Sequence, residues 1–550
     1  MREGRSLPAA AGAVLLACAL VLTAGAARGE AYAPPPGGAA APPVALAAAP
    51  VESPFTAALR QRLAEGGAGP FDAEALGAFY RARGFAPLWV GAGGLTGDGR
   101  ILLQALRAAG RAGAPPGLPG IEDAASQAAP PALAELELRL DAALAAGAAA
   151  ARAALREPET AAGPSVDAAV LAEAATETGD GLPGWLAANL PADPAFWRLA
   201  QAVERYRAIV AQGGWPALPL GPKLTPGAHD PRVLVLRRRL AVSGDAVDAP
   251  AEDPELYDTA LVGAVKGFQA RHGLAVDGVV GTKTVEALNV DAPTRLAQLR
   301  RSLERVSRDP HPIDERYIFV NIAGATLEVH EGGRVIYRDR VVVGRVDRQT
   351  PELKSVIDRV VINPFWYVPA SIARKDLVVR GQKDSAYFSR LNIRIYSSET
   401  ANEIDPATID WFSPQAQALR FRQDPGPENA LGPVKFDFDN PYAVYLHGTA
   451  HQELFDKPAR FFGSGCVRVE RPLDFAAVIL AGNPRYGRSA LDHLVAAGRT
   501  LYVAVPRLWP LHIAYLTAWV DDPGTVQFRP DVYGRDAPLR PPQIAGRRNK

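Results

Sequence analysis

The sequence predicts a multidomain α+β protein in which helical units precede a β-rich domain. Its 550 residues exceed what one compact core holds. Apolar residues follow a helical period from residue 53 to about 290, and short β-rich runs between turns begin near residue 314. The expected order is a signal peptide, a disordered linker, an all-α domain, a small three-helix domain, a β-rich domain and a C-terminal tail, at residues 1–27, 28–52, 53–215, 228–290, 314–506 and 507–550.

The composition argues against one class of function. Hydrophobic residues make up 48% of the chain and charged residues 22%, which suits globular domains with apolar cores. The formal net charge is only +1, whereas a nucleic-acid-binding protein needs many unbalanced Lys and Arg side chains to neutralise phosphates. We therefore expect no nucleic-acid partner.

The first 27 residues have the features of a secretory signal peptide. Arg2 and Arg5 provide a positive start, residues 7–22 are apolar, and residues 24–26 are small enough for cleavage. We therefore expect export from the cytoplasm. Because the apolar run approaches the length of a membrane-spanning helix, an uncleaved anchor with peripheral or anchored membrane association stays open as the alternative.

The cysteine count draws attention to one position. Cys18 lies within the expected signal peptide, so Cys466 is the only cysteine expected in the exported chain and has no internal disulfide partner. A free thiol in an oxidising compartment is either buried and inert or kept for its reactivity. The residues around Cys466 must distinguish these two interpretations.

Two helical units are expected before the β-rich domain. The linker, residues 28–52, is rich in Ala, Pro and Gly and too poor in aromatic residues to form a core. Within residues 228–290, Leu261, Val265 and Phe268 recur at the spacing of one helix face. The run from Phe268 through Gly281 resembles the small three-helix peptidoglycan-binding domain. A packing module without ligand affinity is the alternative, because apolar spacing reports the core and not a binding groove.

The β-rich domain, residues 314–506, contains an expected insertion. Short runs of β-branched and aromatic residues, such as the one beginning at Tyr317, alternate with Gly-containing turns. Between about residues 369 and 432 the pattern becomes longer and more helical. We expect this insertion to act as a lid beside a cleft.

Two polar residues in this domain suggest nucleophilic catalysis. His447 and Cys466 lie 19 positions apart, and each follows an apolar or aromatic stretch that can end a strand. A thiol attacks a carbonyl only as its thiolate, so it needs a base at neutral pH. An imidazole can accept the thiol proton and then return a proton to the departing amine. We expect the backbone carbonyl of Gly448 to orient the imidazole.

The residues next to Cys466 have roles that fit the same chemistry. Gly465 lets a substrate approach the backbone, so that its N–H and that of Cys466 can stabilise an oxyanion. Ser464 can tune the thiolate through a hydrogen bond. Arg468 either pairs with a substrate carboxylate or stabilises the loop. A buried structural cysteine with a satisfied core histidine is the alternative interpretation of the pair.

The sequence around these residues resembles the catalytic motif of the L,D-transpeptidase family. That motif is a His-Gly pair, a gap, then Ser/Thr-x-Gly-Cys followed by an apolar residue and Arg or Asn. Gly463 stands here at the Ser/Thr position and Ser464 at the variable one. The chain resembles the large Gram-negative-type members, which combine a scaffold, a peptidoglycan-binding and a catalytic domain. The segment that contains Trp366 and Tyr367 also looks like that group, and both are expected to bind substrate.

The resemblance implies a peptidoglycan L,D-transpeptidase that acts in the periplasm in cell wall biogenesis and cell shape. Cys466 would attack the third residue of a tetrapeptide stem, and the amine of an acceptor stem would resolve the acyl-enzyme as a 3→3 cross-link. Carbapenems would acylate the same cysteine. Peptidoglycan stem peptides are thus the expected partners, with other cell-wall enzymes as candidates, and no cofactor is expected.

Three alternatives stay open. Water as acceptor would give an L,D-carboxypeptidase, and the acceptor cannot be read from the sequence. A non-catalytic wall-binding protein would need only the peptidoglycan-binding-like domain. A metal site at His447 and His451 is conceivable, but Gly448 stands where the zincin pattern has Glu, so no metal is expected.

Overall fold

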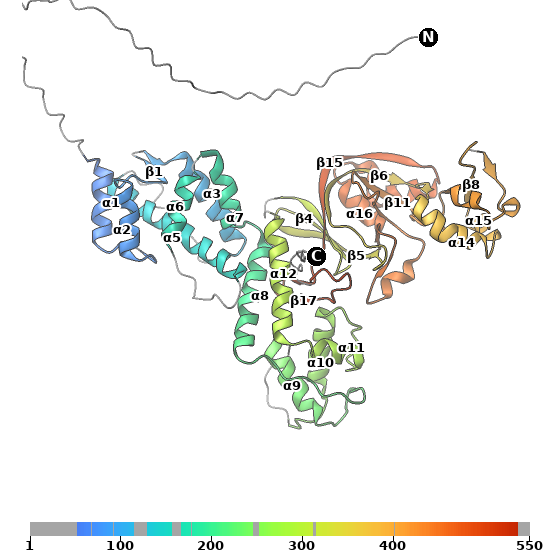
Figure 1. Ribbon diagram of the computed structural model, residues 1–550, viewed down its shortest axis with the longest axis horizontal. Helices are drawn as coiled ribbons and strands as arrows, with labels where there is room; N and C mark the ends of the chain where they lie inside the picture. Colours follow the sequence, from blue (N-terminus) through green and yellow to red (C-terminus); the bar gives the residue numbers. More distant parts are fainter. Residues whose placement is uncertain are drawn as a thin grey trace, which may run out of the picture. The chain divides into compact units, whose positions relative to one another are not determined.

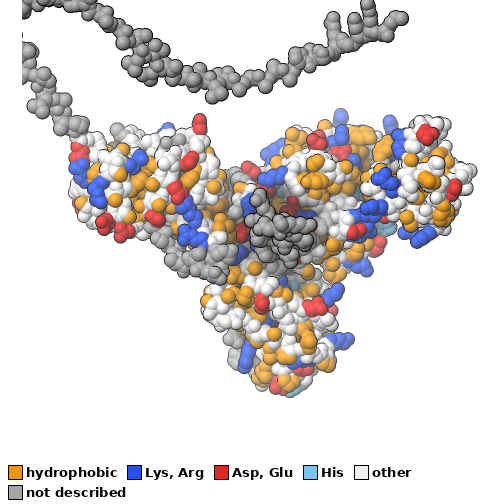
Figure 2. Space-filling view, viewed as in Figure 1, with side chains coloured by type: hydrophobic (Ala, Val, Ile, Leu, Met, Phe, Trp, Pro, Cys, Tyr) orange, Lys and Arg blue, Asp and Glu red, His pale blue; other side chains and the backbone are white. Residues whose placement is uncertain are grey.

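The computed structural model describes residues 52–536 except 68, 92, 115–128, 157–166, 178, 246–251, 312–314 and 401 (Figure 1). The expected signal peptide and nearly all of the expected linker lie outside the described residues. Within the described part of the chain, no helix combines the length and the apolar character that crossing a bilayer requires. Basic and acidic side chains are interspersed on the face shown in Figure 2, in line with the small net charge.

The N-terminal helical region packs around the long helix α5 (Pro130–Leu155), which is buried along most of its length. Glu137 and Asp141 on α5 are fully buried and accept hydrogen bonds from Tyr80 and from the backbone or ring N–H groups of Trp89. These bonds fix the chain after α2 against α5. The remaining elements are α1 (Pro54–Ala64), α2 (Ala73–Ala82), α3 (Gly97–Arg111), α6 (Ala169–Thr176), α7 (Leu182–Asn189), α8 (Pro194–Ala211) and the hairpin β1 (Val90–Gly91) with β2 (Gly94–Leu95).

The hairpin is a small departure from the expected all-α domain. Its two strands have only two residues each, which is too short to produce the alternating pattern that identifies a strand.

The three-helix unit has the core that the sequence predicts. Leu261, Val265 and Phe268 are at most 2% exposed, so the predicted apolar face is confirmed. The ring of His272 stacks on Phe268 and on Phe528, with centroid distances of 3.8 and 5.6 Å. This stacking joins the unit to a strand near the end of the chain. Its helices are α9 (Arg232–Ser243), α10 (Thr259–Arg271) and α11 (Thr282–Leu288).

A further helix, α12 (Ala292–Arg308), follows the three-helix unit and packs beside α8 (Figure 1). The two helices share an apolar core with β16 (Ala518–Val520) and β17 (Val526–Phe528), which form an antiparallel pair. Leu299 and Leu303 of α12 are fully buried there. Segments that are far apart in the sequence therefore meet in one core next to the sheet.

The C-terminal domain is built on a nine-stranded sheet in the order β13-β5-β14-β12-β11-β6-β15-β3-β4. β4 also pairs with β5, so the sheet curls back on itself around its apolar core. Helices α16 (Pro472–Ile479) and α17 (Arg488–Ala496) cover it, and Phe475 packs on Phe436. The strands are β3 (Tyr317–Asn321), β4 (Thr326–Glu331), β5 (Arg334–Gly344), β6 (Leu353–Ile362), β11 (Val434–Phe438), β12 (Leu446–His447), β13 (Phe461–Gly463), β14 (Val467–Val469) and β15 (Leu501–Ala514).

The boundary expected at residue 506 is wrong, because β15 runs through it. β15 pairs with β6 on one side and with β3 on the other, and it continues to Ala514. Its register with β6 shifts between Ala504 and Trp509, so Pro506 lies where the ladder is interrupted. A proline is tolerated at such a bulge because no ladder N–H is needed there. The expected tail thus supplies strands to the folded core.

The insertion contains the short helices that the sequence predicts and also a small sheet that it does not. The four-stranded sheet has the order β7-β10-β8-β9, with its own apolar core around Phe388 and Trp411. The elements are β7 (Trp366–Tyr367), α13 (Ala370–Ile372), the π-helical turn η3 (Ala373–Leu377), α14 (Val378–Gly381), α15 (Ala386–Arg390), β8 (Ile393–Tyr396), β9 (Glu403–Ile404) and β10 (Arg420–Gln423). The insertion is therefore an independent packing unit.

Candidate active site

His447 and Cys466 are brought together by two neighbouring parallel strands. His447 ends β12, and Cys466 directly precedes β14. In the ladder His447 is the partner of Arg468, and the N–H of Val467 donates to the carbonyl of Tyr445 at 3.2 Å. Cys466 therefore lies one residue before the ladder, next to Tyr445.

Strand alternation places the polar side chains of this segment on one face of the sheet. Partner residues in a ladder share a face, and successive residues alternate between faces. Leu446 and Val467 point into the core, where they are at most 1% exposed. Tyr445 and His447 therefore point to the opposite face, together with Lys435, the β11 partner of His447. The same alternation puts Cys466 and Arg468 on that face.

The imidazole of His447 is held in one orientation. The side chain is only 5% exposed, and its Nδ1 donates a hydrogen bond to the carbonyl of Gly448 at 2.5 Å, the contact expected from the sequence. Burial, with the nearby positive charge of Arg468, lowers the pKa of His447 to about 3. The ring is thus neutral near pH 7, and Nε2 is the nitrogen that can accept a proton.

The thiol of Cys466 is protonated at rest. Burial raises its pKa, while hydrogen bonds from Tyr445 and the positive charges of Lys435 and Arg468 act in the opposite direction. The thiol of Cys466 and the imidazole of His447 are therefore both uncharged near neutral pH, and both line the same cavity.

Two glycines shape the loops around the pair. Gly465 has a φ of +109°, a conformation that L side chains rarely adopt, although a Cβ there would meet no atom closer than 3.6 Å. Gly432 has a φ of +62°, and a Cβ there would lie 2.5 Å from the backbone nitrogen of Thr449. Gly432 thus permits close packing on the loop that holds Gly448.

An arginine far away in the sequence connects the loop of Ser464 and Cys466, the candidate nucleophile loop, to the insertion. Nη1 of Arg348 donates to the hydroxyl of Ser464 at 3.1 Å. The same guanidinium pairs with both carboxylate oxygens of Asp376, at 2.5 and 2.9 Å. Asp376 lies on the π-helical turn η3 of the insertion. Ser464, expected to tune the thiolate, is therefore connected through Arg348 to Asp376 of the insertion.

Cys466 and His447 line a cavity of about 800 Å³, and the insertion contributes one of its walls. Trp366 lines this cavity, whereas Tyr367 does not and is 67% exposed. The charged lining is mostly positive, and Asp376 is the single carboxylate among the lining residues, which include Arg348, Lys375, Arg380, Lys383 and Arg468. Such a lining favours a substrate that carries carboxylates.

Three residues of the site were not singled out from the sequence. Tyr445 could have been predicted from the sequence, because it stands two positions before His447 and residues two apart on a strand share a face. Lys435 lies over the Tyr445 ring, with Nζ 4.3 Å from the ring centroid, and it comes from a different strand. Arg348 follows β5 and belongs to no local motif. Only the folded sheet brings Lys435 and Arg348 to the site.

Three family models match separate parts of the chain. The YkuD model, described as "L,D-transpeptidase catalytic domain", matches residues 315–486. A model described as "Scaffold domain" matches residues 74–203, and one described as "Putative peptidoglycan binding domain" matches residues 229–288. The match to the catalytic model includes both His447 and Cys466.

A curated relative and a solved structure were also found. The relative, from Haemophilus influenzae, is named "Putative L,D-transpeptidase" and is 33% identical over 228 residues. The match covers 41% of this chain and 46% of that protein, so the chain spans about half the length of the relative. An L,D-transpeptidase structure from Xylanimonas cellulosilytica, 16% identical, covers 54% of this chain and 99% of its own. Its TM-score of 0.17 is too low to bear on the fold.

Proposed function

Because residues 315–486 of this chain are an L,D-transpeptidase catalytic domain, joined to a scaffold and a peptidoglycan-binding domain, we propose that the protein cross-links peptidoglycan stem peptides. The cross-link is of the 3→3 type and forms through an acyl-enzyme on Cys466. One observation carries the proposal. His447 ends one of two adjacent parallel strands, Cys466 directly precedes the other, and both face one cavity whose charged lining is mostly positive.

The first half-reaction acylates the cysteine. The thiol proton of Cys466 passes to Nε2 of His447 as sulfur attacks the carbonyl of the third residue of the donor stem. The peptide bond to the terminal D-alanine then breaks, and the imidazolium gives its proton to the leaving amine. The product is a thioester on Cys466 and free D-alanine.

The second half-reaction transfers the acyl group. The side-chain amine of the third residue of an acceptor stem attacks the thioester, and His447 accepts the amine proton. The thioester carbon–sulfur bond breaks and the sulfur of Cys466 recovers a proton from the imidazolium. The new amide joins the third residues of two stems.

The contacts around the pair support this cycle. The Gly448 carbonyl fixes the tautomer of His447 that leaves Nε2 free to act as the base. The backbone N–H groups of Gly465 and Cys466 are the proposed donors to the oxyanion. Arg468 and the other cationic lining residues suit the carboxylates of stem peptides, and Trp366 offers an apolar wall.

The place of action is part of the proposal. We infer that residues 1–27 direct export to the periplasm, where peptidoglycan lies, because they combine a basic start, an apolar run and a small-residue site. The peptidoglycan-binding domain would then keep the catalytic domain near its polymer. A role in cell wall remodelling and inhibition by carbapenems follow from the same reaction.

The test is intact-mass spectrometry of the protein and its Cys466→Ala variant. Each is incubated separately with a carbapenem and with a disaccharide-tetrapeptide. We expect a covalent adduct on the unmodified protein alone, together with a dimer that contains a 3→3 link. Trimmed tripeptide without dimer would identify a carboxypeptidase instead. A folded protein that gives neither adduct nor product would favour a non-catalytic wall-binding role.

A further inference from the structure

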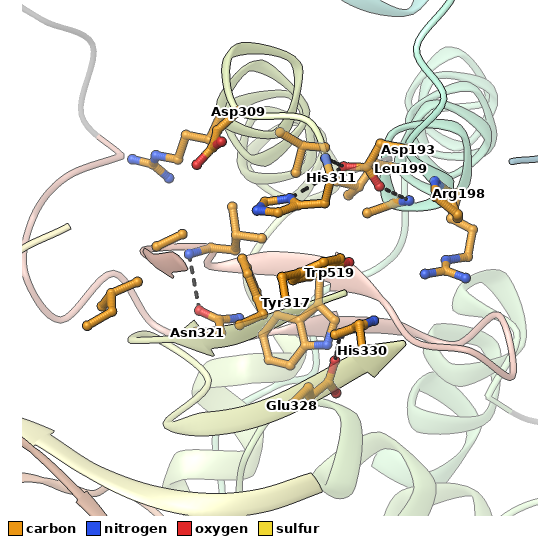
Figure 3. Close-up of a pocket in the computed structure, with 18 of the residues that line it drawn as sticks. Asp193, Arg198, Leu199, Asp309, His311, Tyr317, Asn321, Glu328, His330 and Trp519 are labelled. Carbon is orange, nitrogen blue, oxygen red and sulfur yellow. Dashed lines mark hydrogen bonds and ion pairs between the residues drawn. The ribbon is translucent and has the colours of Figure 1, made fainter. Parts of the chain in front are cut away.

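A second cavity, of about 530 Å³, lies between helices α8 and α12 and the strands β3, β4, β15 and β16. It shares no lining residue with the cavity around Cys466. Figure 3 shows His311 beside Asp193 on the helix side of the cavity, Asp309 farther along the same side, and Tyr317 and His330 on the strands opposite. The proposed reaction uses none of these residues.

Three potential metal ligands meet beside this cavity, which two of them, Asp309 and His311, line. Asp309 directly follows α12, His311 lies two residues later, and His512 comes from β15. One ligand atom from each lies within 4.8 Å of the other two. The rings of the two histidines stand edge to face, with centroids 4.2 Å apart. Two imidazoles and one carboxylate are a donor set typical of transition-metal sites.

One ring nitrogen of each histidine in this cluster is buried without a hydrogen-bond partner. Nε2 of His311 and Nδ1 of His512 are both inaccessible to solvent and make no hydrogen bond within the described part of the chain. His311 as a whole is only 7% exposed. Nδ1 of His512 faces Oδ2 of Asp309 at 3.5 Å, beyond normal hydrogen-bond geometry, whereas Nε2 of His311 has no partner among the described residues. Because buried polar atoms in native proteins are nearly always satisfied, the unpartnered Nε2 of His311 points to a ligand at this cluster.

The other nitrogen of His311 faces a buried carboxylate. Nδ1 lies 3.6 Å from Oδ2 of Asp193, which is 1% exposed and also accepts the backbone N–H of His311 at 2.9 Å. Histidines that bind metals commonly direct their second nitrogen at a carboxylate, which fixes the ring and raises its basicity. Asp193 therefore orients Nε2 of His311 toward the cluster.

We propose that Asp309, His311 and His512 bind one zinc ion. Nδ1 of His512 lies 3.5 Å from Oδ2 of Asp309, close to the edge of about 3.3 Å between two ligands in a tetrahedral zinc site. The separations to His311 are at most 4.8 Å, so coordination needs a small shift of the Asp309 and His512 side chains toward the ring that Asp193 holds. The other carboxylate oxygen of Asp309 pairs with Lys354, an ammonium that is 60% exposed and opposes a cation electrostatically.

With three protein ligands, the ion would keep its fourth position for water. The site connects the end of α12, the segment before β3, and β15, so zinc would join the helical region to the sheet. The sequence did not indicate it, because His512 is far from Asp309 and His311 along the chain and the three match no ligand spacing.

The experiment uses the full chain as the Cys466→Ala variant, so that the catalytic thiol cannot bind zinc. After removal of metal with a chelator and dialysis, zinc chloride is titrated by calorimetry, and Tm is measured with and without zinc. We expect one saturable site and a higher Tm with zinc. His311→Asn and His512→Asn should each lower the affinity at least about tenfold, and the exposed His493→Asn should leave it unchanged.

Lys354→Gln tests the proposal by an expected gain in zinc affinity, and it removes none of the three ligands. Loss of the neighbouring ammonium should raise zinc affinity several-fold. Circular dichroism verifies that each variant is folded. The proposal is overturned if the Cys466→Ala protein shows no saturable zinc binding, if His311→Asn binds zinc equally well, or if Lys354→Gln does not bind it more tightly.

Discussion

The two cavities of this protein differ in charge and in how the chain builds them. The cavity around Cys466 has one carboxylate among its lining residues, against five Lys and Arg side chains. The second cavity is lined by six carboxylates and four Lys and Arg side chains. The first favours an anionic peptide and the second a cation. The net charge of the chain, only +1, therefore does not indicate that one cavity favours anions and the other favours cations.

The largest expected effect is on the rate of cysteine acylation in the cavity around Cys466. His447→Ala should lower the rate of acylation by a carbapenem about 10²- to 10⁴-fold, because it removes the base. Stopped-flow absorbance at several pH values measures the acylation rate of both proteins. As the pKa of His447 is lowered to about 3, the imidazole of the unmodified protein stays neutral as pH falls from 8 to 5. We expect no inflection near pH 6.5, and a loss of rate centred there would contradict the buried, neutral imidazole.

An intermediate effect is expected at the contact between the insertion and the nucleophile loop. Arg348→Ala removes the bonds to Ser464 and Asp376 and should lower kcat/KM for the tetrapeptide about tenfold, because the loop and the cavity wall lose their common partner. Steady-state kinetics measures it. The matched control is Arg390→Ala, which breaks the exposed Arg390–Asp384 pair of the same insertion and should change little. Equal losses in both variants would rule out a specific link.

The smallest expected effect concerns long-range charge. The double variant Lys375→Gln, Lys383→Gln should lower kcat/KM about two- to fivefold at low salt, since exposed charges attract weakly. The difference should shrink as ionic strength rises, because salt screens exposed charges. Asp522→Asn, in the second cavity, should leave kcat/KM unchanged. A similar loss for Asp522→Asn would mean that the two cavities are not electrostatically independent.

The sequence was informative where the chemistry is local. Cys466 and His447 stand in short motifs that flank neighbouring strands, so the pair and its Gly448 contact could be predicted without knowing the fold. The expected multidomain α+β class is also confirmed, since it depends on periodicity over long segments. Both features need only residues close together in the chain or patterns repeated many times.

The features that could not be predicted from the sequence depend on contacts between distant segments or on very short strands. Arg348 lies 116 residues before Ser464, and no pattern in either segment indicates that they meet. The small sheet of the insertion was missed because strands of two to four residues leave little alternation. The boundary expected at residue 506 falls inside β15, and the shifted ladder that lets the strand continue past Pro506 involves pairing with the distant β6.

The position of β15 in the sheet has a consequence for how the protein is made. β15 lies between β6 and β3, both of which precede it by many residues in the chain. While the ribosome is still adding residues 501–514, these two strands can pair with β11 and β4, but the backbone groups on the edges that face β15 stay unpaired. Closing contacts between such distant segments is slow. The sheet that positions Cys466 and His447 is therefore complete only after nearly all of the residues that the structure describes have been synthesised.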